Sequence, residues 1–297
     1  MFENILGNER NKDILTKSIE LNKTSHSYIF WGIEGIGKKL IAEEFAKRIL
    51  CLENKENNCT CKSCIEFDSN NNPDFKLIEP DEGKIKIEQI REMQRKVAEK
   101  PIISSKKVYI INDADTMTTE AQNCLLKTLE EPPEYITIIL ICSNEDNLLS
   151  TIKSRCTRMH FEPLAKEDVK NYINQNYPEQ EISESIIELS QGSIGKAIKL
   201  NEHKSIYENI EKILLSMQNK DLIDIVQMSE EIYKSKEEIN SILEYMNVLL
   251  LKLSKQNIKY IKCIEIVEET KKRLKANSNY DMCIDNLLFN MTFNLHN

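Results

Sequence analysis

The sequence has no long uninterrupted apolar segment. Its 297 residues are 40% hydrophobic, 30% charged and only 6% aromatic, and no apolar run approaches the ~20 residues that a helix needs to cross a bilayer. The first residues, MFENILGNERNKD, are polar and acidic, unlike a secretory signal or a transit peptide. We therefore expect a soluble, helix-rich cytoplasmic protein.

The sequence also lacks an excess of positive charge. It carries 40 Lys and Arg against 48 Asp and Glu, which gives a formal net charge of −8. A stand-alone nucleic-acid-binding protein draws most of its affinity from basic side chains that neutralise phosphates. The acidic balance argues against that class, so any contact with DNA is expected to be local or shared with partner proteins.

Strand and helix signals alternate through the first 163 residues. Strands are predicted at 27–32, 74–78, 107–111, 135–142 and 158–161, and helices at 38–50, 87–100 and 118–130. The segment 135–142, YITIILIC, is apolar along its length, as expected of a central parallel strand that is covered on both faces. This alternation predicts a doubly wound α/β domain with a parallel sheet.

Strand signals end at Pro163. Residues 164–203 fit a small helical unit, and residues 204–297 fit a further all-helical domain. Helices are predicted at 165–176, 182–190, after Gly192, and at 205–217, 221–234, 236–254, 258–275 and 279–294. The apolar positions of the segment 236–254 suit the closing of a helical bundle; they include Ile239, Ile242, Leu243, Met246, Leu249 and Leu250.

Glycine is scarce, and its distribution is uneven. Three of the seven glycines, Gly32, Gly35 and Gly37, fall within six residues of GIEGIGKK at 32–39. A strand before them, a helix after them and Lys38 match the phosphate-binding P-loop, G-x-x-x-x-G-K-[ST]. Such a loop turns tightly and presents backbone N–H groups at a helix N-terminus, which is an anion site. The alternative is a plain strand-to-helix turn, which the combined signals disfavour.

Two positions depart from a working ATPase. Lys39 stands where a Ser or Thr hydroxyl holds Mg²⁺, and the strand 107–111 ends in Asn112-Asp113, where P-loop ATPases carry Asp, often followed by Glu. Asparagine is a weak neutral ligand for Mg²⁺, and Asp113 is one methylene shorter than glutamate. Phosphate affinity could survive these changes, but the machinery for hydrolysis is incomplete.

Two further motifs are characteristic of a family. The segment 125–133, LLKTLEEPP, is followed by an apolar strand and then by Ser154-Arg155-Cys156. In order and spacing these motifs resemble the AAA+ subunits of bacterial DNA polymerase clamp loaders, and the resemblance covers nearly the whole chain. It implies an AAA+ P-loop domain at 1–163, a helical lid domain at 164–203 and a helical collar domain at 204–297, the collar holding five subunits in a ring.

The resemblance also implies roles for single residues. Arg155 is similar to the arginine finger that reaches into the ATP site of a neighbouring subunit, where its planar donors stabilise charge on the γ-phosphate. Ser143 or Asn144 matches the polar sensor after the fourth strand. Gly195 stands where motor subunits carry a lid arginine, and Lys196 beside it is not expected to replace that arginine.

Four of the nine cysteines lie close together in the sequence, at Cys51, Cys59, Cys61 and Cys64. A disulfide framework is not expected in a reducing cytoplasm, whereas four thiolates suit a structural Zn²⁺. Clamp-loader subunits insert a zinc module at this place, with longer gaps between the first three cysteines. We expect structural zinc at 51–64, against the alternative of unliganded thiols. The remaining cysteines are expected to pack as small apolar side chains, namely Cys124, Cys142, Cys156, Cys263 and Cys283.

Within the family this chain resembles the non-motor subunit whose ATPase motifs are commonly lost. We therefore expect a DNA-replication protein that does not bind ATP/Mg²⁺ productively and supplies Arg155 to a neighbouring ATPase subunit of the polymerase III assembly, itself a DNA-directed DNA polymerase and so a transferase. Its expected partners are the motor subunits and the delta subunit of a hetero-pentamer, and through that complex the sliding clamp and primer–template DNA. The alternatives are a divergent motor subunit that holds Mg²⁺ through water and Asp113, and an inactive AAA+ adaptor of another nucleic-acid machine.

Overall fold

The protein divides into two compact units. The structure, a computed structural model, describes residues 2–3, 5–53, 59–177, 182–219 and 221–296. Residues of Met1–Leu164 contact mainly one another, and so do residues of Ala165–Asn297. Each unit is considered by itself below.

The first unit is built on a five-stranded parallel sheet with the strand order β2-β3-β4-β1-β5. The strands are β1 Ser27–Trp31, β2 Phe75–Ile78, β3 Lys107–Ile111, β4 Ile136–Cys142 and β5 Thr157–His160. Every residue of β4 is buried, and β4 lies at the centre of the sheet between β3 and β1. The predicted doubly wound parallel sheet and its central apolar strand are both confirmed.

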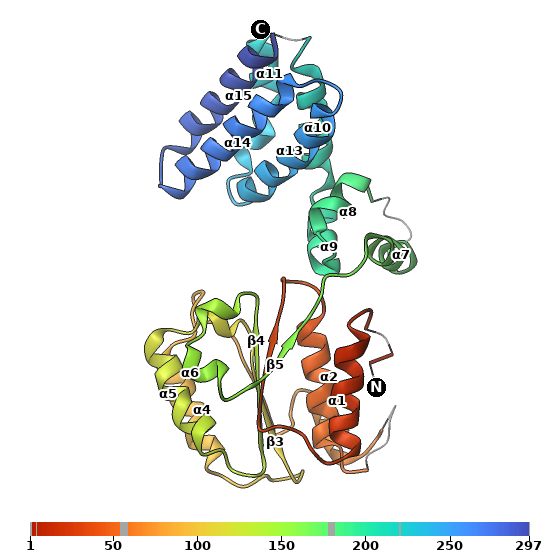
Figure 1. The fold of residues 1–297 in the computed structure, drawn as a ribbon, viewed down its shortest axis with the longest axis vertical. Coiled ribbons are helices and arrows are strands. Elements are labelled where there is room, and N and C mark those ends of the chain that lie inside the picture. The colour runs from red at the N-terminus through yellow and green to blue at the C-terminus, as the bar shows by residue number, and fades with distance from the viewer. Residues whose placement is uncertain (1, 4, 54–58, 178–181, 220, 297) are drawn as a thin grey trace. The chain divides into compact units, whose positions relative to one another are not determined.

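Helices cover both faces of this sheet (Figure 1). They are α1 Glu9–Glu20, α2 Lys38–Leu50, α3 Lys62–Asp68, α4 Ile87–Val97, α5 Thr119–Glu130 and α6 Ser150–Lys153, with short 3₁₀ turns η1 Ala114–Thr116 and η2 Glu145–Asn147. Successive strand side chains point to opposite faces, so Tyr28 and Phe30 pack with α1 and α2, while Ile29 packs with α4 and α5.

Local chemistry sets the ends of α5. The helix begins because the Thr118 side chain accepts a hydrogen bond from the Ala121 amide at 3.2 Å, which satisfies one of the free N–H groups of the first turn. It ends at Glu130, just before Pro132 and Pro133, because proline cannot continue an α-helix. This end of α5 places Glu130 at a fixed point of the fold.

Three helices of the first unit were not expected, namely α1, α3 and α6. In α1 only Lys12 and Leu15 are buried, so its apolar face is too sparse to give a clear helical period. The second, α3, lies among the cysteines of the predicted zinc module, and the third, α6, is a single turn of 4 residues. The helix predicted to reach residue 100 ends at Val97.

The described residues of the second unit form helices and no strand. The helices are α7 Lys166–Asn176, α8 Glu184–Ser190, α9 Ile194–Glu202, α10 Lys204–Ser216, α11 Leu222–Met228, α12 Glu230–Lys234, α13 Ile239–Ser254, α14 Lys259–Lys275 and α15 Tyr280–His296. The segment predicted as one helix at 221–234 is divided at Ser229, whose hydroxyl donates back to the Ile225 carbonyl at 2.7 Å. Such back-bonding by serine bends helices.

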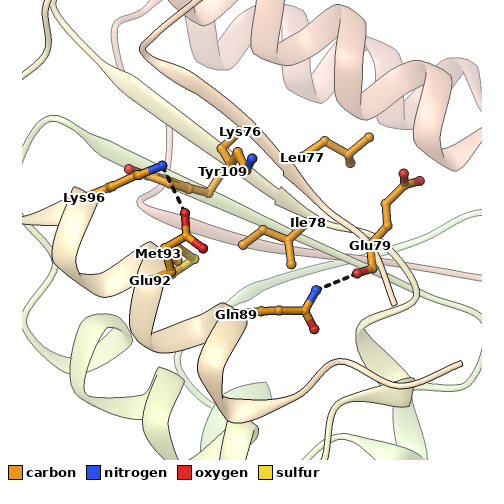
Figure 2. Close-up of a pocket in the computed structure, with 9 residues that line it drawn as sticks. All are labelled: Lys76, Leu77, Ile78, Glu79, Gln89, Glu92, Met93, Lys96 and Tyr109. Atoms are coloured by element: carbon orange, nitrogen blue, oxygen red, sulfur yellow. Dashed lines mark hydrogen bonds and ion pairs between the residues drawn. The ribbon is translucent and has the colours of Figure 1, made fainter. Parts of the chain in front are cut away.

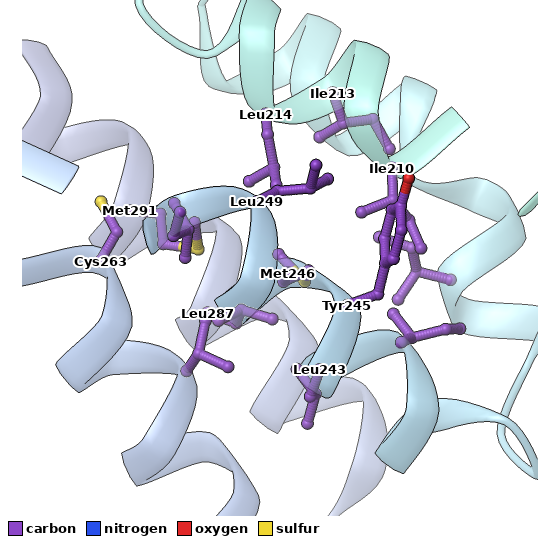
Figure 3. Close-up of a cluster of buried hydrophobic side chains, with 14 of the residues drawn as sticks. Ile210, Ile213, Leu214, Leu243, Tyr245, Met246, Leu249, Cys263, Leu287 and Met291 are labelled. Carbon is purple, nitrogen blue, oxygen red and sulfur yellow. The ribbon is translucent and has the colours of Figure 1, made fainter. Parts of the chain in front are cut away.

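The core of the second unit surrounds α13. Figure 3 shows side chains of α10, α13, α14 and α15 gathered around Met246 and Leu249. The apolar positions predicted to close a bundle, from Ile239 to Leu250, are all buried. Leu189 and Leu250 belong to one cluster, so the boundary between lid and collar at 203/204 stays a prediction. Across the described ranges, no helix has the length and apolarity that crossing a membrane requires.

Candidate functional site

The loop between β1 and α2 makes the tight turn that its glycines predict. Gly32, Gly35 and Gly37 have φ angles of 149°, 76° and 90°, in a region that side chains with a β-carbon disfavour. Gly37 is the N-cap of α2. The loop therefore has the backbone form of an anion-binding turn at a helix N-terminus.

Lys38 is folded back onto its own loop. Its Nζ donates to the carbonyls of Gly32 at 2.5 Å and of Ile33 at 2.7 Å, and only 6% of the residue is exposed. Burial lowers the pKa of Lys38, although nearby groups including Asp113 act against that shift. Because an ammonium has three donors, these two bonds leave one donor for a ligand.

Lys39 is paired with a carboxylate. Its Nζ lies 2.8 Å from Oε1 of Glu79, the residue that follows β2. A cation stands where the Mg²⁺ ligand of a working P-loop belongs, and it repels a metal ion instead of binding it. The structure thus provides no hydroxyl for Mg²⁺ at this position.

A pocket of about 190 Å³ is lined by residues of β2 and α4 and by Tyr109 of β3. Figure 2 shows its lining, in which Gln89 donates to the backbone carbonyl of Glu79 at 2.8 Å and Lys96 pairs with Glu92 at 3.1 Å. None of the glycines or lysines of the P-loop lines this pocket. The pocket adjoins the P-loop through one residue, because Glu79 lines it and also pairs with Lys39.

The two residues of the acidic motif after β3, Asn112 and Asp113, bond to each other. The Asn112 side-chain amide donates to the Asp113 carboxylate at 3.0 Å, and Asp113 adopts a left-handed φ of 50°. Burial raises the pKa of Asp113, Asp115 and Glu34 raise it further, and Lys38 opposes the shift. The carboxylate of Asp113 and the ammonium of Lys38 thus each favour the charged form of the other.

Asp115 is a residue that the sequence reasoning missed. Its Oδ2 accepts hydrogen bonds from the backbone amides of Ser143 at 3.2 Å and Asn144 at 3.0 Å. It therefore ties the turn after β3 to the end of β4, where a polar sensor was expected. The Ser143 residue itself is exposed. The only sequence signal for Asp115 was its place in the polar turn NDAD.

The backbone of Arg155 is fixed from two sides. Its N–H donates to the Ile152 carbonyl at 3.0 Å, in the turn after α6. Its carbonyl accepts a hydrogen bond from the hydroxyl of buried Ser27, the first residue of β1, at 2.8 Å. The arginine therefore projects from a turn that is anchored to the central part of the sheet.

The Arg155 side chain reaches the end of α5. Nη2 lies 2.8 Å from Oε1 of Glu130, and Nη1 donates to the Thr151 carbonyl at 2.8 Å and to the Ser154 hydroxyl at 3.3 Å. The side chain remains 35% exposed. The two family motifs, LLKTLEEPP and Ser-Arg-Cys, thus meet through one ion pair.

Cys156, next to Arg155, is a packed thiol. Burial raises its pKa to about 11, and a thiol that stays protonated is a poor nucleophile. The expectation that Cys156 packs rather than reacts is consistent with this environment.

The position of the missing lid arginine lies in the first turn of α9. Ser193 caps this helix by accepting from the Lys196 amide at 3.0 Å, and Gly195 follows Ile194 there. The Lys196 ammonium pairs with Glu244 of α13 at 3.0 Å. Lys196 is therefore engaged within the helical unit.

The four clustered cysteines converge. The sulfur atoms of Cys51, Cys59, Cys61 and Cys64 all lie within 4.8 Å of one another, and the Cys51 and Cys59 sulfurs are 3.6 Å apart. Zn–S bonds of about 2.3 Å place the sulfurs of a tetrahedral site about 3.8 Å apart. Residues 54–58 of the predicted module lie outside the described part of the chain.

The pKa of the Cys61 thiol is lower than that of an ordinary cysteine. Burial opposes its ionisation, but the backbone amides of Leu52 and Cys64 donate to its sulfur and bring its pKa down to about 7. Zinc binds the thiolate. Four converging sulfurs with amide donors fit a structural zinc ion.

Hydrogen bonds hold the residues next to Cys51 and Cys64 in place. The Ser104 hydroxyl donates to the Leu50 carbonyl at 2.7 Å and lies 3.0 Å from the Ser63 hydroxyl. Leu50 precedes Cys51, and Ser63 precedes Cys64. The Asp74 carboxylate, on a residue only 2% exposed, accepts three backbone N–H groups of the segment 102–104. Such contacts behind the ligands orient a metal site.

A parallel α/β sheet with a glycine-rich, lysine-containing turn between β1 and α2 defines a protein of the P-loop type. Residues 7–165 match the profile of the family described as "DNA polymerase III, delta subunit". The chain belongs to this family, and within it to the delta-prime clamp-loader subunits.

Individual relatives are subunits of DNA polymerase III. The chain is 35% identical to the DNA polymerase III subunit delta' of Bacillus subtilis over 205 residues, covering 68% of this chain and 61% of that protein. It is 32% identical to subunit tau/gamma of Haemophilus influenzae over 210 residues, covering 68% of this chain and 30% of that protein. The chain thus spans about six tenths of the Bacillus relative and less than a third of the Haemophilus one.

A solved structure shares the fold. A gamma subunit-related protein of Thermotoga maritima superposes with a TM-score of 0.54 at 19% identity, covering 95% of this chain and 99% of that one.

Proposed function

We propose that this chain is a non-motor subunit of a DNA polymerase III clamp loader that supplies Arg155 to the ATP site of an adjacent subunit. One observation carries the proposal: an anchored arginine coexists with a P-loop whose Mg²⁺ positions are lost. Lys39 is paired with Glu79, and Asn112 bonds to Asp113. Neither arrangement offers the ligands that bring Mg²⁺ to β- and γ-phosphates.

Arg155 is suited to stabilise the negative charge that develops on a transferred phosphoryl group. In phosphoryl transfer, charge spreads over the γ-phosphate oxygens, and an arginine supplied in trans accelerates the step by about 10³ to 10⁵. A guanidinium suits this role because its planar donors stay charged. The anchored backbone of Arg155 and its partly exposed side chain favour such a use.

Partners follow from the family and from the surface of the helical unit. Met282, Phe289 and Phe293 of α15 are 63%, 52% and 60% exposed, and the two phenylalanine rings stack at 6.3 Å. Large exposed apolar side chains mark association surfaces. We infer that this unit supplies the lid and the collar of a hetero-pentamer with motor and delta subunits.

The assembly gives the chain its cellular role. The complex loads the sliding clamp onto primed DNA in the cytoplasm, and the chain itself adds no polymerase chemistry. The cysteine cluster holds structural zinc in the first unit. Both statements rest on the family and on the four converging sulfurs.

The test is reconstitution with the motor and delta subunits. The isolated chain is expected to show no Mg²⁺-dependent ATP turnover. Arg155→Ala is expected to enter the complex normally and to lower its DNA-stimulated ATP turnover and clamp loading severely, and Arg155→Lys to restore little, because lysine lacks the planar fork. Unchanged turnover with Arg155→Ala would remove the finger assignment, and failure to enter a pentamer would remove the clamp-loader role.

A divergent motor subunit is the second candidate. The observation that favours it is the intact turn, with Lys38 and three glycines in P-loop form. ATP turnover by the purified chain, abolished by Lys38→Ala, would decide for this candidate.

A further inference from the structure

Glu130 holds the guanidinium of Arg155 in place. The carboxylate ends α5, and its Oε1 lies 2.8 Å from Nη2 of Arg155. We propose that Glu130 is a positioning residue: it orients Arg155 for the ATP site of the neighbouring subunit. This inference rests on the proposed function of Arg155.

The contacts of the guanidinium leave room for a ligand. A guanidinium carries five N–H donors. Within the described residues, the acceptors given by Glu130, Thr151 and Ser154 engage Nη1 and Nη2. Three acceptors for five donors hold the group without saturating it, so the remaining N–H groups stay available to phosphate oxygens.

An arginine side chain without restraining contacts has no fixed orientation. A long flexible side chain loses rotamer freedom when it docks, and a group held beforehand in its docked geometry loses less. The Arg155 backbone is already fixed by Ser27 and Ile152. Glu130 extends that restraint to the tip of the side chain, where charge must be placed.

The same pair contributes little to the stability of the fold. Arg155 is 35% exposed and Glu130 is 49% exposed, and ion pairs that are this exposed are screened by solvent. A contact between two motifs that adds little to stability is better explained by orientation of the arginine. The opposite role, in which Glu130 withholds Arg155 from phosphate, predicts an effect of opposite sign.

The experiment compares carboxylate-to-amide changes in the reconstituted complex. Glu130→Gln removes the charge and keeps the shape. Glu131→Gln is the matched control, because Glu131 is an adjacent exposed carboxylate for which the described structure shows no ion pair. We expect Glu130→Gln to lower kcat for ATP about three- to tenfold, with unchanged KM, melting temperature and complex formation. We expect Glu131→Gln to match the wild type.

A double substitution separates positioning from a general effect. With Arg155→Ala already present, Glu130→Gln is expected to cause no further loss, because residues that act through one another are not additive. In the isolated chain, Glu130→Gln is expected to speed proton exchange and rotation of the Arg155 guanidinium, as followed by ¹⁵N NMR. A purely structural role would not change that signal.

Wild-type or raised turnover with Glu130→Gln, or an equal loss in the Arg155→Ala background, overturns the role of Glu130 alone. Unchanged turnover with Arg155→Ala overturns the finger assignment and the role of Glu130 together.

Discussion

Gly32 lies directly against the backbone carbonyl of Phe161. A β-carbon at Gly32 would approach that oxygen to 2.4 Å, and Phe161 itself donates its N–H to the Trp31 carbonyl at 2.8 Å. The first glycine of the P-loop is therefore required by the packing of the sheet edge as well as by the turn. This explains how the loop keeps its shape although its Mg²⁺ positions have changed.

We predict that Gly32→Ala destabilises the protein by about 1–3 kcal/mol, because the new methyl group clashes with backbone and the φ angle is strained. Urea unfolding measures the change. Gly83→Ala is the control: Gly83 also has a positive φ, of 78°, but no atom of the described residues lies within 4 Å of the place that its new methyl group would take. Equal losses at the two glycines would show that the contact with Phe161 has no effect.

Asp113 should make stability depend on pH. Burial and nearby carboxylates raise its pKa in the folded state above the unfolded value of about 3.9. The folded state therefore favours the protonated acid, and ionisation costs stability as pH rises through the folded pKa. Asp113→Asn is expected to raise the melting temperature at pH 7, and this gain should shrink as pH falls toward about 3.9.

Asp115 provides the matched comparison for this titration. Its carboxylate accepts two backbone N–H groups, so Asp115→Asn is expected to lower the melting temperature at pH 7 by weakening charge-assisted bonds. A gain from Asp113→Asn that stays constant from neutral pH down to about pH 3.9, the unfolded pKa, would contradict the account of Asp113.

The cysteine cluster predicts one zinc ion per chain in protein purified without chelator. Cys64→Ser should remove the metal and lower the stability of the first unit, whereas Cys263→Ser, at a buried thiol of the second unit, should leave zinc content unchanged. Ser104→Ala should keep the site but weaken its zinc affinity by about 10- to 100-fold, because it removes support behind two ligands. Absence of stoichiometric zinc by metal analysis would contradict the assignment.

Much of the fold was predictable because its signals are local. The apolar run of β4, the glycines before α2 and the prolines after α5 each act through neighbours in the sequence. The helix α1 was missed because it buries so few side chains. The break at Ser229 was missed because back-bonding by a serine leaves no mark on the apolar period.

For the candidate site, the sequence identified single residues but not the partners with which they interact. The motifs identified Lys39 and Arg155, but their partners Glu79 and Glu130 lie 40 and 25 positions away. Pairings of this kind depend on strand order and on where helices end, which periodicity does not reveal. Asp115 was overlooked for the same reason, since its role depends on the neighbouring strand β4.

The central claim is that the chemistry takes place in a neighbouring subunit, and it predicts opposite behaviour of two basic residues of this chain. The measurement is DNA-stimulated ATP turnover by the reconstituted complex containing either Arg155→Ala or Lys38→Ala. We predict that Arg155→Ala lowers turnover at the neighbouring site by about 10³-fold or more, while Lys38→Ala leaves turnover at the wild-type level. Loss of turnover with Lys38→Ala, together with wild-type turnover for Arg155→Ala, would contradict the account.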